Sequence, residues 1–218
     1  MIKKAFIFDL DGVIVDTARY HFFAWQKIAA ELGVEFTPEH NEKLKGVSRV
    51  RSLEIILELG KITAREDDRQ RWLHQKNEDY LDYIANMNDS EILPGVMHTL
   101  KFLKRNNQPI ALGSASKNAR PILQKVGILD YFDAIVDGND VTNAKPDPEV
   151  FLQAARQLGA TPGDSIVFED SEAGIDAANI AGMTSVGIGD SKILHRAHFC
   201  FPDFTHVDSA FLETLINR

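Results

Sequence analysis

Five short apolar runs, each bounded by turn residues, constrain the fold of this 218-residue chain more than any other feature. Between them lie segments with helical periodicity, such as Glu149 to Leu158. Strands that alternate with helices pair in parallel and bury both faces of their sheet. We therefore expect an α/β fold with a parallel sheet. Its expected strands are Ala5 to Leu10, Ile110 to Gly113, Ala134 to Val136, Ser165 to Phe168 and Thr184 to Ile188.

Residues from about 18 to 87 contain no comparable apolar run and have helical patterns instead. Apolar residues recur at helical spacing before Gly33 and again before Gly60, which are suitable C-terminal residues for helices. A third helix is expected to begin at Thr63, because Thr63 and Glu66 have the spacing of a capping box. The chain is therefore expected to form a discontinuous core domain, residues 1–16 and 89–218, and an all-helical cap domain, residues 17–88. An insert at this point lies over the carboxyl ends of the strands, where open α/β sheets bind ligands.

One charged residue interrupts the apolar stripe of the third expected helix. Lys76 is in register with Trp72 and Tyr80. Two interpretations stay open for it. The side chain either buries its stem and carries the ammonium to the edge of the helix, or it points toward a ligand.

Composition narrows the classes of partner. The net charge of −8 and the pI near 5.4 argue against a nucleic-acid-binding protein. No apolar run approaches the ~20 residues of a membrane helix, so we expect no membrane partner. The single cysteine, Cys200, cannot form an internal disulfide, which favours a cytoplasmic protein. No coiled-coil heptad demands a dimer, and we expect a monomer that acts on a small molecule.

Reactive side chains follow four of the expected strands. Because the carboxyl ends of parallel strands meet at one edge of the sheet, these side chains are expected to converge there. A helix cap would account for one acidic residue, but not for four of them with a lysine and a serine. The residues are Asp9 and Asp11 after the first strand, Ser114 after the second, Lys145 after the third, and Glu169 and Asp170 after the fourth.

These residue types together suit phosphoryl transfer. Four carboxylates repel one another unless a cation lies among them, and oxygen ligands favour Mg²⁺. An ionised aspartate can attack phosphorus, and a second carboxyl, held protonated by its environment, can give a proton to the leaving oxygen and take one from the incoming hydroxyl. Asp9 and Asp11 fit these tasks, because strand-like spacing would point both in the same direction.

The segments "DLDGVIVDT", "SAS", "KPDP" and "EDSEAG" resemble, in order, the four motifs of the haloacid dehalogenase (HAD) superfamily. They extend across nearly the whole chain. The resemblance implies a Rossmann-like core, an aspartate nucleophile and one Mg²⁺ ion. It also implies roles for individual residues. Asp9 would be the nucleophile and a metal ligand, Asp11 the acid/base and a ligand through its backbone carbonyl, Glu169 and Asp170 further metal ligands, and Ser114, Ala115 and Lys145 the phosphoryl-binding residues.

Within the superfamily, "TARYHFFAWQ", "LKGVSR" and "SASKN" resemble the sugar-phosphate mutases that interconvert β-glucose 1-phosphate and glucose 6-phosphate. Such an enzyme is an intramolecular phosphotransferase, with β-glucose 1,6-bisphosphate as primer and intermediate. It must hold a small phosphorylated sugar by both ends, so it needs a second anion site, for which an arginine is well suited. The resemblance implies that the substrate-binding residues are Thr17, His21, Lys45, Gly46, Arg49, Lys76, Ser116, Lys117 and Asn118.

Two other functions stay open. A Mg²⁺-dependent sugar-phosphate phosphatase on the same scaffold would use water, rather than a sugar, to discharge the aspartyl phosphate. The two activities differ in whether a closed cap excludes water, which depends on motions that a sequence does not report. A non-enzymatic phosphosugar-binding protein is the other alternative, but it would not need a nucleophile beside an acid.

Overall fold

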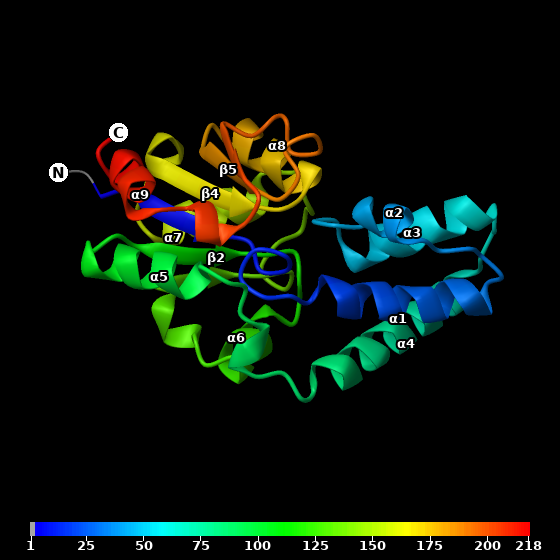
Figure 1. Ribbon diagram of the computed structural model, residues 1–218. Coiled ribbons are helices and arrows are strands. Elements are labelled where there is room, and N and C mark those ends of the chain that lie inside the picture. The colour runs from blue at the N-terminus through cyan, green and yellow to red at the C-terminus, as the bar shows by residue number, and fades with distance from the viewer. Residues whose placement is uncertain (1–2) are drawn as a thin grey trace.

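The structure is a computed structural model that describes residues 3–218, so residues 1–2 of the expected core lie outside the described residues. Its centre is a sheet with the strand order β3-β2-β1-β4-β5-β6, in which all neighbours are parallel (Figure 1). The expected parallel sheet is therefore confirmed. The strands are β1 (Ala5–Phe8), β2 (Ile110–Gly113), β3 (Ala134–Val136), β4 (Ser165–Glu169), β5 (Thr184–Ile188) and β6 (Phe199–Phe201).

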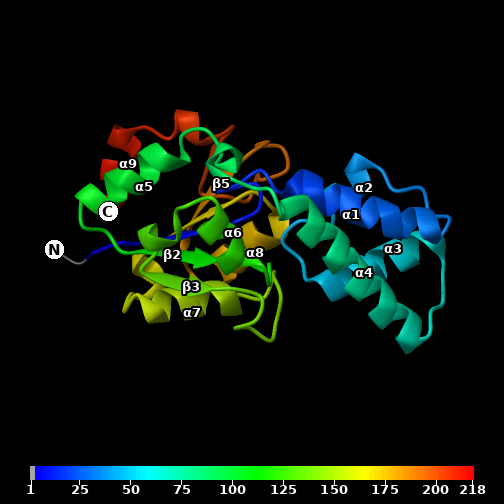
Figure 2. The ribbon, with the colours of Figure 1, turned by 90° about the horizontal axis from the view of Figure 1, so that it is seen from below.

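Helices cover both faces of this sheet. Phe6 and Phe8 of β1 pack into an apolar cluster with α5, α6 and α9, whereas Ile7 packs into a second cluster with α7 and α8. Figure 2 shows α5 and α9 on one side of the strands and α7 on the other. Burial on both faces explains why the strands have continuous apolar runs. These helices are α5 (Val96–Arg105), α6 (Ala119–Lys125), α7 (Glu149–Gln157), α8 (Glu172–Ile180) and α9 (Ser209–Ile216), with short 3-10 helices at Asp89–Glu91, Leu129–Tyr131, Pro162–Asp164 and Phe204–His206.

Four further helices follow β1 and lie together beyond the carboxyl ends of the strands, away from both termini (Figure 1). Trp25, Ile56 and Trp72 contribute to an apolar cluster of their own. We call α1–α4 the cap helices, and the sheet with α5–α9 the core. The cap helices are α1 (Ala18–Glu31), α2 (Pro38–Glu42), α3 (Arg49–Gly60) and α4 (Glu66–Ile84).

The expected start of the last cap helix is wrong. Helix α4 begins at Glu66, its N-cap is Arg65, and no side chain caps it, so Thr63 and Glu66 form no capping box. Instead, Glu66, Asp67 and Asp68 occupy the first turn, where carboxylates interact favourably with the helix dipole. Within residues 3–218, no helix is long and apolar enough to cross a membrane.

Two connections join the cap helices to the core, and they are hydrogen-bonded to each other. Val15 pairs with Ile92, and Leu93 N donates to Ile14 O at 3.0 Å. Gly12 precedes them with a φ of +80°, and a Cβ there would lie 2.3 Å from Asp170 Oδ2. Glycine is therefore required for the chain to turn beside the acidic residues at the end of β4. The expected domain boundaries, 16/17 and 88/89, lie beside these connections and stay a prediction.

Candidate active site

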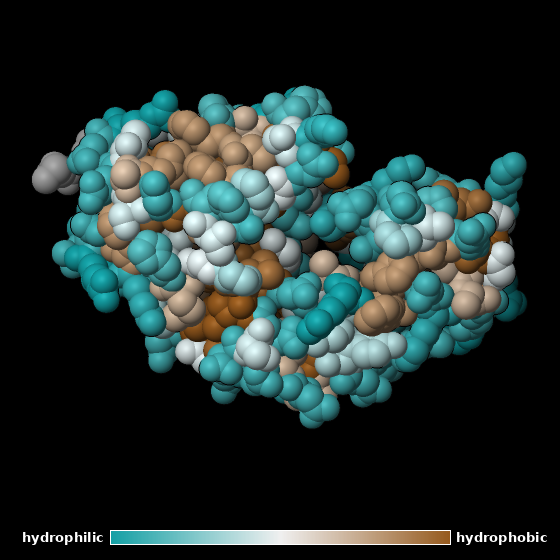
Figure 3. All heavy atoms as spheres, in the orientation of Figure 1, coloured by the Kyte–Doolittle hydropathy of each residue, from teal (hydrophilic) through white to brown (hydrophobic). Residues whose placement is uncertain are grey.

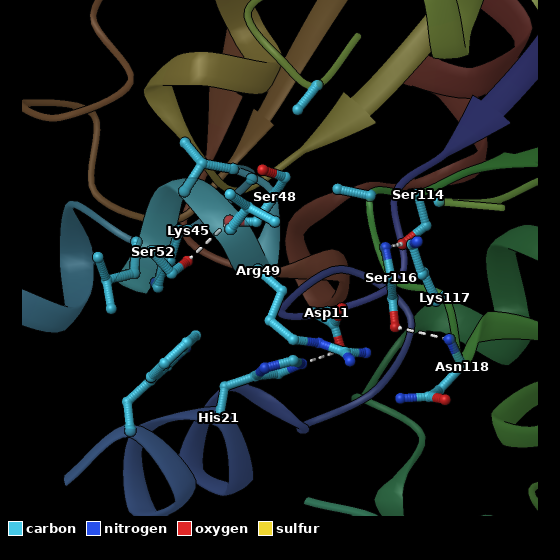
Figure 4. A pocket seen from close by; sticks show the side chains of 18 of the residues that line it. Asp11, His21, Lys45, Ser48, Arg49, Ser52, Ser114, Ser116, Lys117 and Asn118 are labelled. Atoms are coloured by element: carbon cyan, nitrogen blue, oxygen red, sulfur yellow. Dashed lines mark hydrogen bonds and ion pairs between the residues drawn. The ribbon is translucent and has the colours of Figure 1, made fainter. Parts of the chain in front are cut away.

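A cavity of about 550 Å³ lies between the cap helices and the carboxyl ends of the strands. Figure 3 shows the surface hollowed where the two parts meet, and Figure 4 shows side chains from both parts pointing into the pocket. The strands that follow β1 in the chain are added first on one side of it, as β2 and β3, and then on the other, as β4 to β6. Open α/β sheets bind ligands at the carboxyl ends of the strands where the strand order reverses in this way. The predicted residues that line the cavity are Asp9, Asp11, His21, Lys45, Gly46, Arg49, Lys76, Ser114, Ala115, Ser116, Lys117, Asn118 and Asp170, while Thr17, Lys145 and Glu169 are buried.

Three carboxylates converge at the core side of the pocket. Asp9 follows β1, and Glu169 and Asp170 lie at the end of β4; one oxygen of each lies within 4.8 Å of the others. Lys145 Nζ donates to Asp9 Oδ1 at 2.6 Å and to Glu169 Oε2 at 2.8 Å. The predicted convergence of strand-end residues is thus present in the structure, with the lysine between two of the acidic residues.

The negative charge of this cluster exceeds what Lys145 neutralises. Burial raises the pKa of Asp9 well above its ordinary value, although the lysine opposes the shift. Burial, and then the charge of Glu169, raise the pKa of Asp170 to about 7. Oxygen donors with uncompensated charge fit a hard divalent cation. Asp9, Glu169 and Asp170 would therefore hold the Mg²⁺ ion that the HAD resemblance implies.

The Asp11 carboxyl belongs to a different environment from that of Asp9. Its Oδ1 accepts a hydrogen bond from Thr17 Oγ1 and lies 3.7 Å from His21 Nε2. Burial favours the neutral form, but the hydrogen bonds and charge of His21, together with Thr17 and Lys76, lower the pKa of Asp11 below its ordinary value. The expectation that its environment holds Asp11 protonated is therefore wrong. Its neighbours are donors and cations, which stabilise the carboxylate.

A buried basic pair adjoins Asp11. Lys76 Nζ lies 2.8 Å from His21 Nδ1, and its side chain is 2 % exposed. When Lys76 carries its proton, the ammonium donates to Nδ1, and the ring proton of a neutral His21 then lies on Nε2, toward Asp11. Burial, with the nearby charge of Arg49, lowers the pKa of Lys76 to about 7. Of the two interpretations of Lys76, the structure thus has the side chain pointing inward and not toward the edge of the helix.

The loop of residues 114–118 after β2 forms another wall of the pocket. Ser114 Oγ accepts from Ser116 N at 3.1 Å, and Ser116 Oγ accepts from Asn118 N at 3.3 Å (Figure 4). Asn118 Nδ2 donates to Asn77 Oδ1 of the cap helix α4 at 3.3 Å. These bonds give the loop a defined shape next to the cap helices.

Three further predicted cations, Lys45, Arg49 and Lys117, lie on different parts of the pocket wall. Lys45 lies 3.2 Å from Asp170 Oδ2, so a cap residue reaches the acidic cluster. Figure 4 shows Arg49 extending from α3 toward the side where Ser116 and Asn118 lie. Within residues 3–218, neither Arg49 nor Lys117 has an acidic partner in an ion pair, and burial lowers the pKa of Arg49. This side of the pocket therefore presents unneutralised positive charge.

Sequence reasoning missed several lining residues. Ser48 and Ser52 face the pocket beside Arg49, and Ser52 Oγ donates to Ser48 O at 3.1 Å. Trp25 places its ring 5.3 Å from Lys76 Nζ. Ser48 is the N-cap of α3, so the preference for serine before a helix could have located it. Trp25 belongs to the apolar residues at helical spacing before Gly33, and no sequence signal distinguishes it from a core residue.

The geometry of this site agrees with similarities to known proteins. The chain is 46% identical over 191 residues to a β-phosphoglucomutase of Bacillus subtilis, which covers 87% of this chain and 84% of that protein. It is 30% identical over 201 residues to a phosphorylated carbohydrates phosphatase of Thermotoga maritima, and the alignment covers 89% of this chain and 91% of that protein. The crystal structure of a β-phosphoglucomutase from Clostridium difficile superimposes with a TM-score of 0.94 at 42% identity and covers 99% of this chain and 98% of that one. The family model of haloacid dehalogenase-like hydrolases matches residues 3–182, and the chain belongs to this family.

Proposed function

We propose that this protein is a β-phosphoglucomutase, which interconverts β-glucose 1-phosphate and glucose 6-phosphate through β-glucose 1,6-bisphosphate. The observation that carries the proposal is the charge distribution of the pocket. Asp9, Lys145 and the acidic pair after β4 suit a phosphoryl group in transfer, whereas Arg49 and Lys117 offer unneutralised positive charge for a second phosphate. The similar proteins named β-phosphoglucomutase support the same substrate.

The two aspartates divide the chemistry. In the cycle we infer, Asp9 carries a phosphoryl group from the bisphosphate primer, and the sugar 6-hydroxyl attacks its phosphorus while Asp11 takes the hydroxyl proton. The bisphosphate then turns over in the pocket. Asp9 attacks the phosphorus on the other end, and the C1 oxygen leaves with the proton from Asp11. The lowered pKa of Asp11 suits the first step, which needs the carboxylate.

The neighbours of these residues assist each step. Lys145 neutralises charge on the transferring phosphoryl group, and Ser114 and Ala115 line the same end of the pocket. Mg²⁺, when bound by Asp9, Glu169, Asp170 and the backbone carbonyl of Asp11, supplies further charge neutralisation. His21 and Thr17 orient the Asp11 carboxyl.

The cap domain, residues 17–88, which contains the cap helices, acts as a lid in this proposal. Lys45, Gly46, Arg49 and Lys76 all come from the cap, so bound sugar phosphate would draw both parts together and exclude water. Exclusion of water makes the sugar, and not water, the acceptor of the phosphoryl group. The sugar phosphate is the only partner that the proposal requires.

A coupled assay tests the proposal. Purified protein with Mg²⁺, β-glucose 1-phosphate and a trace of β-glucose 1,6-bisphosphate is expected to form glucose 6-phosphate, measured through its oxidation by a dehydrogenase. Asp9→Asn keeps the shape of the side chain but removes the nucleophile, so it should reduce the rate to background. Absence of glucose 6-phosphate with the native protein would refute the proposal.

A further inference from the structure

The turn of residues 137–140 holds the 114–118 loop by its backbone. Gly138 N donates to Ser116 O at 3.2 Å, and Asn139 Nδ2 donates to Lys117 O at 3.0 Å. These bonds occupy two carbonyl oxygens that would repel an anion if they faced the pocket. Ser116 and Lys117 both line the cavity.

Arg120, in the first turn of α6, fixes the shape of that turn. Asp137 is 1 % exposed, and its Oδ2 accepts from Arg120 Nη1 while its Oδ1 accepts from Asn139 N at 2.8 Å and Asn139 Nδ2 at 2.9 Å. Arg120 Nη2 also donates to Ile135 O at 2.8 Å and to Asp140 Oδ2 at 3.0 Å. A buried carboxylate needs a paired cation, so the turn depends on this arginine.

The backbones of the turn and of the loop are in close contact. A Cβ on Gly138 would lie 2.3 Å from Ala115 O and 3.1 Å from Lys117 Cγ. Only glycine permits this approach, and a displacement of the turn would therefore displace the loop as well.

The residues that make these bonds stay outside the pocket. Neither Arg120 nor Asp137 nor Asn139 lines the cavity, and the arginine side chain is 45 % exposed. We propose that Arg120, Asp137 and Asn139 are positioning residues that hold Ser116 and Lys117 in place for the phosphate that is not being transferred. This inference rests on the proposed function, because it assigns the 114–118 loop to the second phosphate of the sugar.

Kinetics with two phosphoryl sources test the proposal. Arg120→Ala and Asn139→Ala are compared with the native protein and with Arg196→Ala, which removes an exposed ion pair to Asp176 elsewhere on the core. The first source is the bisphosphate primer, with β-glucose 1-phosphate as the acceptor of the phosphoryl group. The second is acetyl phosphate, which has no second phosphate. This donor reports only the phosphorylation of Asp9, which is measured by mass spectrometry.

The expected result is a selective loss. Arg120→Ala and Asn139→Ala should raise KM for β-glucose 1-phosphate by about tenfold, with a smaller change in kcat, because the sugar loses part of its binding energy. Both variants should be phosphorylated by acetyl phosphate at the same rate as Arg196→Ala. The melting temperature of Asn139→Ala should also equal that of Arg196→Ala. Arg120→Lys, which retains the charge beside Asp137, should recover part of the lost affinity.

Two outcomes would overturn the inference. Unchanged KM in both variants, in an assay where the native protein forms glucose 6-phosphate, refutes the positioning role and leaves the proposed function intact. An equal loss with both phosphoryl sources also refutes it, because the residues would then support the fold as a whole. Failure of the native protein to form glucose 6-phosphate, in contrast, refutes the proposed function itself.

Discussion

On the core side of the pocket, Lys145 lies between Asp9 and Glu169 in hydrogen-bonded ion pairs, whereas on the cap side His21 and Lys76 lie near a single carboxylate, that of Asp11. Within residues 3–218, Arg49 adds a positive charge that has no acidic partner in an ion pair. The core side carries an excess of negative charge and the cap side an excess of positive charge. The first arrangement fits a metal ion, and the second fits an anionic ligand. The comparison indicates that the acidic cluster at the strand ends is built for the reacting phosphoryl group, and that the cap, together with the 114–118 loop of the core, is built for recognising the rest of the substrate.

The two sides also differ in how they are supported. The core residues follow strands that are buried on both faces, so their backbone is fixed before any ligand binds. The cap residues lie on helices that join the core through two paired connections. In the proposed mutase, the substrate would bring the cap side into its working position, and substitutions on the two sides should change different kinetic constants.

The largest effect is expected on the core side, from Lys145→Ala. Removal of the Lys145 side chain leaves the buried carboxylates of Asp9 and Glu169 without their cation. It also removes the positive charge that neutralises the phosphoryl group during transfer. We expect kcat to fall by about 1,000-fold in the coupled assay. Lys104→Ala, which breaks an exposed ion pair to Asp133, is the matched control and should retain native kcat. A near-native kcat in Lys145→Ala would contradict the proposal that the core side neutralises the charge of the transferring phosphoryl group.

A smaller and different effect is expected on the cap side, from Arg49→Ala. Loss of a charged hydrogen-bond donor to phosphate should raise KM for β-glucose 1-phosphate by about 10- to 100-fold. Phosphorylation of Asp9 by acetyl phosphate should stay at the native rate, because that donor has no second phosphate. Arg51→Ala, on the same helix but in exposed pairs with Glu54 and Glu58, serves as the control. An equal loss with both donors would contradict the division between the two sides.

The third effect concerns stability, and not catalysis, on the cap side. The pKa of Lys76 is about 7 in the folded protein and 10.5 ordinarily, so between these values the unfolded chain binds a proton that the folded protein does not. Stability should therefore rise with pH across this window, by at most about 1.4 kcal/mol per pH unit from this group. Urea unfolding from pH 7 to 10 should show the rise in the native protein and a weaker one in Lys76→Met. Identical slopes would mean that Lys76 stays charged when buried.

Much of the fold and of the site could be predicted from sequence because their signals are local. Apolar runs ended by Asp9, Ser114 and Glu169 locate both the strands and the edge where the reactive residues gather. Strand β6 was missed although the equally short β3 was predicted, and the two differ in burial: all three residues of β6, around Cys200, are only half-buried. It is held in place by distant packing, with Phe199 and Phe201 against Phe211.

The charge states and supporting contacts could not be predicted in the same way. The lowered pKa of Asp11 depends on Thr17, His21 and Lys76, which the fold brings together from separate turns of α1 and α4. The contact between Arg120 and Asp137 likewise joins α6 to the end of β3. In the sequence these are ordinary surface residue types, and only the folded geometry gives them a shared environment.

The central claim is that the pocket delivers the phosphoryl group of Asp9 to a sugar and not to water. The most direct test is the ratio of glucose 6-phosphate formed to inorganic phosphate released by the native protein, with Mg²⁺, primer and saturating β-glucose 1-phosphate. We expect glucose 6-phosphate in large excess. Inorganic phosphate as the main product would contradict the claim and identify the protein as a sugar-phosphate phosphatase.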